Sequence, residues 1–436
     1  MIILIDDLGS QDVGAYGQKY MQTPNIDALA GEGMRWTNAY SSCPVCSPTR
    51  AAILTGKSTA RVHFTGHITA IERHRYPENS RIIPPDDLMY IPKEEIILAE
   101  ALRPAGYTSI SIGKWHVGGE GYWPTDQGFD YNIGGWTHGS PPGYFYPYIS
   151  EEKDWNSNIP TLSGGKDGEY LTDRLTDEAI DFMQKHQGEP FLMYLSHYAV
   201  HTPLQGPHEL VDKYKKILKN TKIDPVYAAM VENVDWNIGR VMKELDDLGL
   251  AKKTVVIFAS DNGAVAGFTD NHPFREGKGH LYEGGLRVPY IMRWPGHVMP
   301  GTVCEKPTIS EDIYSTIVDI AGTEAVFNSP VDGRSLVSDF TKTENSTDGR
   351  ELHWYYPHYV GHSMQPGAAI RSGSYKLIEF YDPPRVELYN LVEDISERND
   401  LLGEMPEKKQ ELLDKLHQWL KYSGTIMHTM NPNFNE

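Results

Sequence analysis

Short apolar runs alternate with segments of helical periodicity along most of this chain, and this alternation is the feature that most constrains its fold. Apolar runs of strand length occupy residues 1–5, 107–112, 191–195, 254–259 and 289–293. Helical spacing of apolar residues marks 94–103, 171–186 and 225–248. Strands without polar alternation are buried on both faces. The pattern therefore predicts an α/β fold with a mostly parallel central sheet sandwiched by helices.

The last part of the chain has a different pattern. Strand-like runs at 352–356, 368–371, 375–381 and 386–389 are separated by turn residues, and 406–421 reads as one helix. This order predicts a small antiparallel sheet packed by one helix. A polar stretch precedes it. We therefore expect a catalytic domain at 1–340, a linker at 341–350 and a C-terminal α+β subdomain at 351–436.

Charge and hydropathy limit the partners of the chain. It has 436 residues and a formal net charge of −19, which argues against nucleic acid or an anionic membrane as the main partner. An anionic substrate then requires a local basic cluster. No stretch approaches the roughly 20 apolar residues of a membrane span. A core strand at residue 1 predicts a removed export signal and a periplasmic or secreted location, while the oligomeric state stays open.

Cysteine is scarce, with Cys43, Cys46 and Cys304 as its occurrences. An odd, small number excludes a disulfide framework. Cys43 and Cys46 form a C-x-x-C, which is typical of redox or zinc sites. No second C-x-x-C follows, so a structural zinc site is disfavoured, and a redox site leaves the following Pro-Thr-Arg unexplained.

The segment after Cys46 predicts a helix. Ser47 is a good N-cap, Pro48 suits the first helical position, and Gly56 ends the pattern. Cys46 then lies at the positive end of the helix dipole, with Arg50 about one turn further on. Such a position holds an anion and a reactive group together.

Polar residues follow several of the predicted strands. Asp6 and Asp7 follow the first, Asp261 and Asn262 follow a later one, and a Gly-Lys-Trp-His run at 113–116 follows another. Sites in such sheets form at the carboxyl ends of strands, so we expect one shared site. The acidic and amide oxygens are hard ligands that suit calcium or magnesium.

The run Cys-Ser-Pro-Thr-Arg, with its Leu-Thr-Gly end at 54–56, resembles the signature of the type I sulfatases. These formylglycine-dependent enzymes belong to the alkaline phosphatase superfamily, and the resemblance extends over essentially the whole chain. It implies an alkaline-phosphatase-like fold. It also implies that a separate formylglycine-generating enzyme oxidises Cys46 to an aldehyde, whose hydrate supplies the oxygen that attacks sulfur.

The resemblance implies a metal site as well. Asp6, Asp7, Asp261 and Asn262, with an oxygen of the modified Cys46, would bind Ca²⁺, with Mg²⁺ the less favoured ion. The metal would polarise a sulfate oxygen and stabilise the ionised nucleophile.

Five basic residues receive catalytic roles from the same resemblance. Lys114 serves the sulfate and aldehyde region, Lys278 clamps the sulfate, and Arg50 belongs to the same local basic pocket. His116 deprotonates the second hydroxyl of the sulfated hemiacetal and so releases sulfate. His201 faces the leaving oxygen and donates a proton to it, with His197 as the competing assignment. We also expect the Lys114 and His116 side chains to lean to the same side of an extended segment.

Specificity is expected in the loops 61–67, 136–148, 271–275 and 353–362. The predicted substrate-binding residues are Lys114, His201, Lys278, His272, Arg275 and His353. The aromatic run 353–359 is either a strand packed on the larger domain or a sugar-binding rim. The chain is similar to bacterial sulfatases of sulfated polysaccharides, which implies exo action on galactose or N-acetylgalactosamine sulfate, 4-O before 6-O.

Two other functions remain open at this point. The first is a phosphomonoester or phosphonate hydrolase, because related sites also cleave phosphoryl groups. Comparing turnover of an aryl sulfate with turnover of an aryl phosphate distinguishes a sulfatase from such a hydrolase. A non-catalytic protein that binds sulfated glycans is the third reading. The joint presence of Cys46, Arg50, His116 and His201 argues against it.

Overall fold

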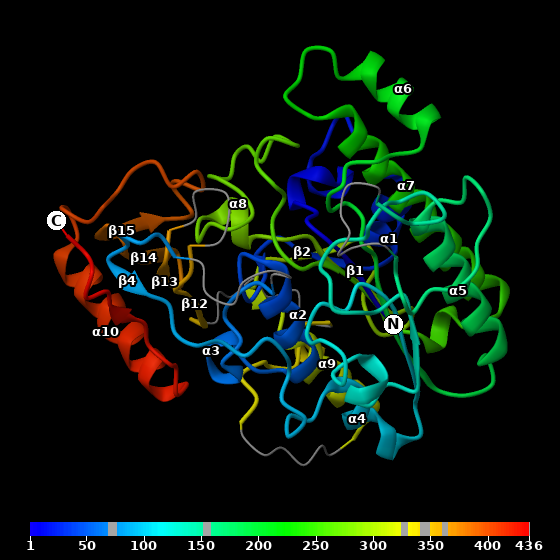
Figure 1. The fold of residues 1–436 in the computed structure, drawn as a ribbon, viewed down its shortest axis with the longest axis horizontal. Helices are drawn as coiled ribbons and strands as arrows, with labels where there is room; N and C mark the ends of the chain where they lie inside the picture. Colours follow the sequence, from blue (N-terminus) through cyan, green and yellow to red (C-terminus); the bar gives the residue numbers. More distant parts are fainter. Residues whose placement is uncertain (69–75, 151–157, 324–329, 341–348, 360–364, 436) are drawn as a thin grey trace.

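The centre of the fold is an eight-stranded sheet in the order β10-β2-β9-β8-β1-β7-β5-β6 (Figure 1). The computed structural model describes residues 1–68, 76–150, 158–323, 330–340, 349–359 and 365–435. The strands of this sheet are β1 (Ile2–Ile5), β2 (Met34–Trp36), β5 (Thr108–Gly113), β6 (Tyr131–Ile133), β7 (Phe191–Ser196), β8 (Val256–Ser260), β9 (Tyr290–Arg293) and β10 (Thr302–Cys304). In this sheet β9 pairs antiparallel with β8 and β2, and the other pairs are parallel. The predicted mostly parallel sheet is confirmed.

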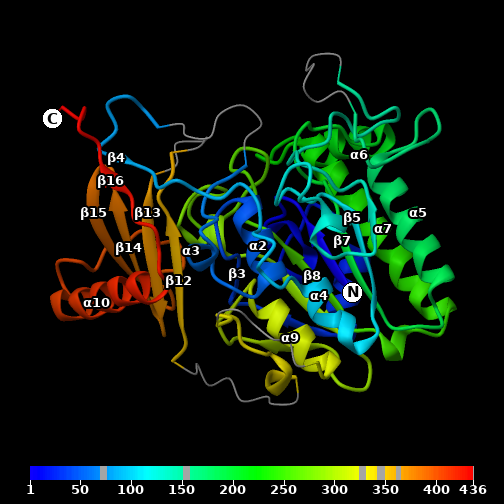
Figure 2. The ribbon, with the colours of Figure 1, turned by 60° about the horizontal axis from the view of Figure 1, so that its bottom comes forward.

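Alternate side chains of β1 enter two different hydrophobic cores. Ile3 and Ile5 belong to the core shared with α1 (Pro24–Glu32), α5 (Leu171–Lys185) and α7 (Pro225–Asp247). The core on the opposite face contains Ile2 and Leu4 and is shared with α2 (Cys46–Thr55), α4 (Leu98–Leu102) and α9 (Asp312–Ala321). Both faces of the strand are therefore covered by helices, as its unbroken apolar sequence predicts. Figure 2 shows α5 and α7 on the far side of the sheet from α9, and α6 (His208–Ile217) packs on α7.

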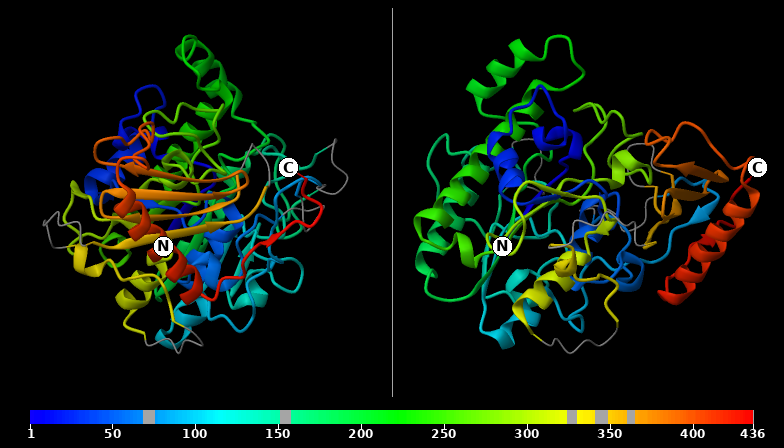
Figure 3. Two further views of the ribbon diagram at one scale, coloured as in Figure 1. Left: turned by 90° about the vertical axis from the view of Figure 1, so that its left-hand side faces the viewer. Right: turned by 180° about the vertical axis from the view of Figure 1, so that it is seen from behind.

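A second sheet lies at the C-terminal end of the chain (Figure 3). It is an antiparallel meander of β12 (Glu351–Tyr356), β13 (Gly367–Ser372), β14 (Tyr375–Tyr381) and β15 (Pro384–Asn390). One face packs on Leu412, Leu416 and Leu420 of α10 (Pro406–Tyr422). The other face places Trp354 and Tyr356 in a core shared with residues from the larger part of the chain. The small antiparallel sheet with one helix is thus confirmed.

Shorter elements complete the described part of the chain. Two small sheets pair β3 (Ala39–Tyr40) with β11 (Thr308–Ile309) and β4 (Ile82–Ile83) with β16 (Thr429–Met430). The short α-helices are α3 (Thr59–Val62) and α8 (Glu283–Leu286). The 3₁₀ turns are η1 (Ser10–Asp12), η2 (Gly14–Tyr16), η3 (Arg103–Ala105), η4 (Pro124–Gln127), η5 (Ala251–Lys253) and η6 (Val337–Asp339).

Two predicted helix starts are wrong. The helix expected from residue 94 begins only at Leu98, because the Ile97 N–H donates to the Glu100 carboxylate at 3.1 Å and fixes the first turn there. The other helix begins at Cys46 itself, with Val45 as N-cap instead of Ser47. The Ser47 hydroxyl is used elsewhere, as described below. Gly56 ends this helix in a left-handed conformation, as predicted.

The predicted domain boundaries stay predictions. Residues 341–348 of the expected linker lie outside the described residues, and so do 360–362 of the last specificity loop. Within the described ranges, no helix combines the length and hydropathy that a bilayer span requires.

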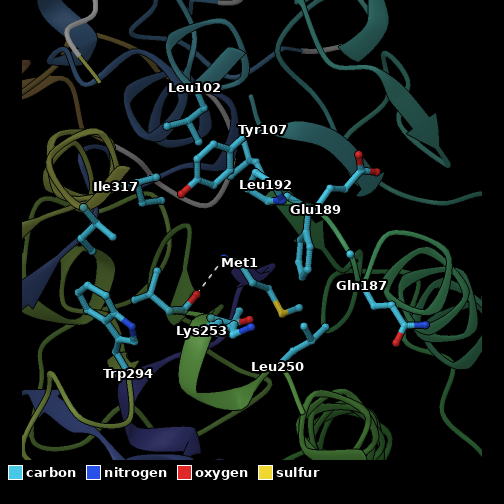
Figure 4. Close-up of a pocket in the computed structure, with 16 residues that line it drawn as sticks. Met1, Leu102, Tyr107, Gln187, Glu189, Leu192, Leu250, Lys253, Trp294 and Ile317 are labelled. Atoms are coloured by element: carbon cyan, nitrogen blue, oxygen red, sulfur yellow. Dashed lines mark hydrogen bonds between the residues drawn. The ribbon is translucent and has the colours of Figure 1, made fainter. Parts of the chain in front are cut away.

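A cavity of about 340 Å³ lies at the amino ends of the strands around Met1 (Figure 4). Its wall includes Leu102, Tyr107, Trp294 and Ile317, and the Met1 amino group donates to the Val255 carbonyl at 2.9 Å. The metal-type acids and the basic residues predicted from the sequence do not line this cavity.

Candidate active site

The predicted acids and bases meet at the carboxyl ends of neighbouring strands. Asp6 and Asp7 follow β1, which lies between β8 and β7. Asp261 and Asn262 follow β8, and the Gly-Lys-Trp-His run begins at the end of β5. The first turn of α2 brings Cys46 to the same place, fully buried. The fold therefore assembles one centre from segments that are distant in sequence.

Oxygen ligands surround the Cys46 thiol. Its Sγ lies 3.4 Å from Asp6 Oδ1 and 3.8 Å from Asp7 Oδ1. Asn262 Nδ2 donates to Asp7 Oδ1 at 2.9 Å, and the Asp7 N–H donates to Asp261 Oδ1 at 3.2 Å. Burial raises the pKa of the Cys46 thiol above its ordinary value. This setting differs from that of a nucleophilic cysteine, whose thiol pKa is depressed.

The donor set fits a hard divalent cation. Ligand atoms of Asp6, Asp7, Cys46 and His201 lie within 4.8 Å of one another. Asn262 Oδ1 is buried and has no hydrogen-bond partner among the described residues. A buried amide oxygen without a partner is costly unless a cation or water satisfies it. Three carboxylates and one amide oxygen suit calcium or magnesium better than zinc.

Arg50 and Lys114 neutralise two of these acids. The Arg50 guanidinium contacts Asp261 Oδ2 through Nε at 2.8 Å and Nη2 at 2.7 Å, and Nη1 donates to the Lys114 carbonyl and the Ser196 hydroxyl. Lys114 Nζ donates to Asp6 Oδ2 at 2.6 Å. Burial raises the pKa of Asp6 to about 8, although Lys114 opposes the shift. Arg50 therefore lowers the pKa of Asp261, whereas at Asp6 the effect of burial outweighs that of Lys114.

Lys278 neutralises the third acid. Its Nζ lies 2.6 Å from Asp7 Oδ1 and 2.8 Å from Oδ2. Burial alone would raise the pKa of Asp7, but Lys278, with His201 and Lys114, lowers it below its usual range. The neighbouring Gly277 packs on backbone, since a Cβ there would lie 2.4 Å from the Ala264 carbonyl oxygen. The absence of a Cβ therefore lets the loop that carries Lys278 pack closely on the segment after β8.

His116 lies on the other side of Cys46. Its Nε2 donates to the Ile68 carbonyl at 3.0 Å, and the Ser47 hydroxyl lies 3.1 Å from Nδ1, an arrangement that assigns the proton to Nε2. Burial lowers the pKa of His116 well below its usual value. The residue has a positive φ of 58°, so the segment is not extended there as expected, yet His116 and Lys114 both lie near Cys46.

His201 contacts the acid group, whereas His197 does not. His201 Nε2 lies 3.7 Å from Asp7 Oδ2, and Nδ1 lies 2.9 Å from the Thr202 carbonyl. The Tyr144 hydroxyl donates to the His201 carbonyl at 2.8 Å and holds its loop. Burial, with the Lys278 ammonium, lowers the pKa of His201 to about 3. His197 is fully buried, and neither of its ring nitrogens has a hydrogen-bond partner among the described residues.

His67 joins the centre and was not singled out from the sequence. Its ring packs edge-on against His116 at 4.8 Å, and ligand atoms of His67, His116 and Cys46 lie within 4.8 Å of one another. It was included only within the specificity loop 61–67. No local motif marks it, because its position depends on how that loop returns over α2.

The remaining substrate-binding candidates occupy three different places. His272 lines a polar cavity of about 520 Å³. Arg275 stacks on Tyr282 and donates to the Glu397 carbonyl at 2.9 Å. His353 stacks on Trp419 of α10, with ring centroids 4.8 Å apart. The structure does not test their contact with substrate, and these assignments stay predictions.

Comparison with known proteins agrees with this geometry. Residues 1–323 match the sulfatase family model, and residues 272–424 match the C-terminal model of N-sulphoglucosamine sulphohydrolase. A sulfatase of Formosa agariphila is 31% identical, covering 96% of this chain and 88% of the relative. The N-acetylgalactosamine-6-sulfatase of Mus musculus is 32% identical, covering 86% and 71%.

Solved structures agree on the fold. The crystal structure of Ps i-CgsB in complex with k-i-k-neocarrahexaose has a TM-score of 0.81 and 28% identity, covering 99% of this chain and 93% of that one. A phosphonate monoester hydrolase of Agrobacterium radiobacter, at 19% identity and a TM-score of 0.69, shares the fold.

Buried cations surround an oxygen-rich acid group at the carboxyl ends of parallel strands, and such a centre suits a hard cation together with an anionic ester. The chain belongs to the sulfatase family and is accordingly a sulfuric ester hydrolase.

Proposed function

We propose that this enzyme removes sulfate from sulfated carbohydrates, with formylglycine at position 46 and a bound calcium ion. The arrangement around Cys46 is the observation that carries the proposal. Its Sγ lies against Asp6 and Asp7 at the first turn of α2, and Lys114 and Lys278 each pair with one of those acids. A separate formylglycine-generating enzyme is the partner that this chemistry requires.

With formylglycine and calcium in place, the hydrated aldehyde would supply the oxygen nucleophile, and the metal would polarise the sulfate ester. Asp6, Asp7, Asp261 and the free oxygen of Asn262 would hold the ion. The chain's cations have a separate task. Arg50, Lys114 and Lys278 are fixed by buried contacts, so their charge faces the sulfuryl group without reorganisation.

We assign the two proton transfers of the reaction to two histidines. His116, neutral and hydrogen-bonded through Nε2, accepts the proton whose removal releases sulfate from residue 46. His201 donates a proton to the departing alcohol. A bound sulfate ester adds negative charge beside His201, which favours its protonated form.

The relatives support a saccharide as the substrate class. One is named N-acetylgalactosamine-6-sulfatase, and the solved structure of Ps i-CgsB holds a neocarrahexaose. We propose that the substrate is a sulfated galactose or N-acetylgalactosamine, and that the enzyme removes sulfate by exo action. We also propose a preference for 4-O over 6-O sulfate, although the name of the murine relative favours the 6-O position. A periplasmic or secreted location is the matching expectation for a glycan substrate.

A substrate panel tests the proposal. Enzyme matured by a formylglycine-generating enzyme is assayed on 4-O- and 6-O-sulfated galactose and N-acetylgalactosamine, a steryl sulfate, an aryl sulfate and an aryl phosphate. We expect the sulfated sugars to have the highest kcat/KM. A higher kcat/KM on steryl sulfate would contradict the carbohydrate assignment, and a higher value on aryl phosphate would contradict the sulfatase assignment.

A further inference from the structure

A cavity of about 520 Å³ lies between three loops, two of which follow the strands that lead to the candidate active site. One loop follows β1 and contributes Lys19 and Tyr20. The second precedes α7 and contributes Lys222. The third follows β8 and contributes Asp270 and His272. The first and third loops extend from the strands that carry Asp7 and Asp261, so the cavity is built on the scaffold of the catalytic centre.

A short hydrogen-bonded connection links the cavity to that centre. Gln11 lines the cavity and is four residues beyond Asp7, so their Cα atoms are at most about 14 Å apart. The Tyr227 hydroxyl donates to the Asp7 carbonyl at 3.2 Å and to Asp12 Oδ2 at 2.6 Å. Asp12 also accepts from the Thr269 hydroxyl. The two places are therefore held in a fixed relation, close enough for one extended ligand to reach both.

Among the described residues, the lysines of the cavity have no partner. Lys19 and Lys222 are exposed, and neither ammonium forms an ion pair or hydrogen bond with the part of the chain that the structure describes. Asp270 is the one carboxylate in the lining, and its Oδ1 accepts the His272 N–H at 3.1 Å. In a chain with a net charge of −19, two unpaired lysines facing one hollow favour an anionic ligand.

The cavity also offers an aromatic face on a fixed turn. The side chain of Tyr20 is 49% exposed. Gln18 Oε1 accepts from the N–H groups of Lys19 and Tyr20, both at 2.8 Å, while its Nε2 donates to the Gln11 carbonyl at 2.8 Å. This network holds the turn in place before any ligand arrives. A tyrosine ring has an apolar face and a polar edge, which suits the face of a pyranose.

We infer that this cavity is a second saccharide subsite, which binds a neighbouring sugar that carries its own sulfate. The inference rests on the proposed function, because it places the scissile sulfate of the same glycan at Cys46. Lys19 and Lys222 would contact the second sulfate, and Tyr20 would stack on the sugar ring. The enzyme would then favour multiply sulfated oligosaccharides over singly sulfated monosaccharides.

The test compares two double variants with the same change in charge. Lys19→Met with Lys222→Met removes the cations of the cavity, and Lys216→Met with Lys252→Met removes two exposed lysines elsewhere. Each is made in the active chain and in the Cys46→Ala chain. The probes are tetrasaccharides of chondroitin sulfate and carrageenan, their desulfated counterparts, inorganic sulfate and an aryl sulfate.

Calorimetry with the Cys46→Ala chain should show that the cavity variant binds a sulfated tetrasaccharide about 2- to 30-fold more weakly, the effect of two exposed ion pairs. In the active chain, the ratio of kcat/KM on that tetrasaccharide to kcat/KM on aryl sulfate should fall by the same factor, mostly through KM. The control variant should match the wild-type chain in both measurements.

Equal affinity of the two double variants would overturn the inference, and so would the absence of binding by every tetrasaccharide at a Kd of about 1 mM. Loss of binding to inorganic sulfate alone, with tetrasaccharide binding unchanged, would also overturn it by showing a simple anion site. Failure of the proposed function has a different signature: the matured wild-type chain would hydrolyse no sulfate ester, while lysine-dependent glycan binding persisted.

Discussion

Lys278 and Asp7 are 271 positions apart in the chain, yet the lysine ammonium lies within 2.8 Å of both carboxylate oxygens of the aspartate. The contact joins the loop after β8 to the end of β1. The contact also shows how the repulsion among the buried carboxylates is offset, because each carboxylate next to Cys46 has its own cation. A metal ion and a sulfate ester therefore enter a group of charges that is already balanced.

Calcium binding should depend on the unpartnered oxygen of Asn262. Asn262→Ala removes one of the proposed ligands without removing a charge, so we expect calcium affinity to fall about 10- to 100-fold. Calorimetry on chelator-stripped protein measures this, with the exposed Asn399→Ala as control.

After chelation, Ca²⁺ should restore activity better than Zn²⁺, because the ligands are oxygen atoms. Full activity in excess chelator, with no metal found by elemental analysis, would disprove the metal site.

The role of His201 should depend on the leaving group. A sugar hydroxyl leaves as a basic alkoxide and needs a proton, whereas a nitrophenolate largely does not. His201→Ala should therefore lose about 10²- to 10⁴-fold in rate on a sulfated sugar and much less on an activated aryl sulfate. Equal losses on both substrates, measured with chemistry rate-limiting, would mean that another group donates the proton. His197→Ala serves as the comparison, since that ring makes no hydrogen bond with the described residues.

Gly139 should be required for the position of His116. A Cβ at Gly139 would lie 2.3 Å from His116 Cε1, whereas a Cβ at Gly119 would meet nothing closer than 3.8 Å. Because His116 is assigned to sulfate release, Gly139→Ala should slow that release, and Gly119→Ala should not. Steady-state and burst kinetics on an aryl sulfate distinguish slow release from slow attack. Identical kinetics in the two glycine variants would refute this steric argument.

The Lys376 side chain connects the C-terminal sheet to α8, which follows the loop that carries Lys278. We expect this contact to stabilise the fold. It is fully buried and contacts Glu283 at 3.0 Å and Glu397 at 2.9 Å. Lys376→Met leaves the buried Glu397 carboxylate without its cation and leaves Glu283 with Arg287 alone, so it should cost about 3–5 kcal/mol of unfolding free energy. Lys415→Met removes a half-exposed partner of Glu351 and Glu411 and should cost less than about 1 kcal/mol. Denaturant unfolding measures both, and comparable losses would contradict the assignment.

The sheet could be predicted because its strands are buried on both faces. Residues 1–5 and 191–195 are continuous apolar runs, and the structure has β1 and β7 there. The strands β2, β6 and β10 were not predicted, because each has three residues and such short runs carry no periodic signal.

The candidate centre was accessible from sequence where strand ends carry polar residues and where motifs resemble a family. Asp6, Asp261 and Lys114 were found in this way. His67 was not singled out, because its contact with His116 depends on the path of a loop. The Ser47 hydroxyl shows the same limit, since its contact with His116 Nδ1 outweighs the cap that its sequence position predicts.

The central claim is that Cys46 becomes the formylglycine that cleaves sulfate esters. The most direct test measures two quantities on the same samples, prepared with graded amounts of a formylglycine-generating enzyme. Mass spectrometry of the peptide that contains residue 46 gives the fraction converted, and aryl sulfate hydrolysis gives kcat per total enzyme. The account predicts that kcat rises in proportion to the converted fraction and vanishes in Cys46→Ala. Unchanged turnover across samples with different conversion, or near-normal activity in Cys46→Ala, would contradict it.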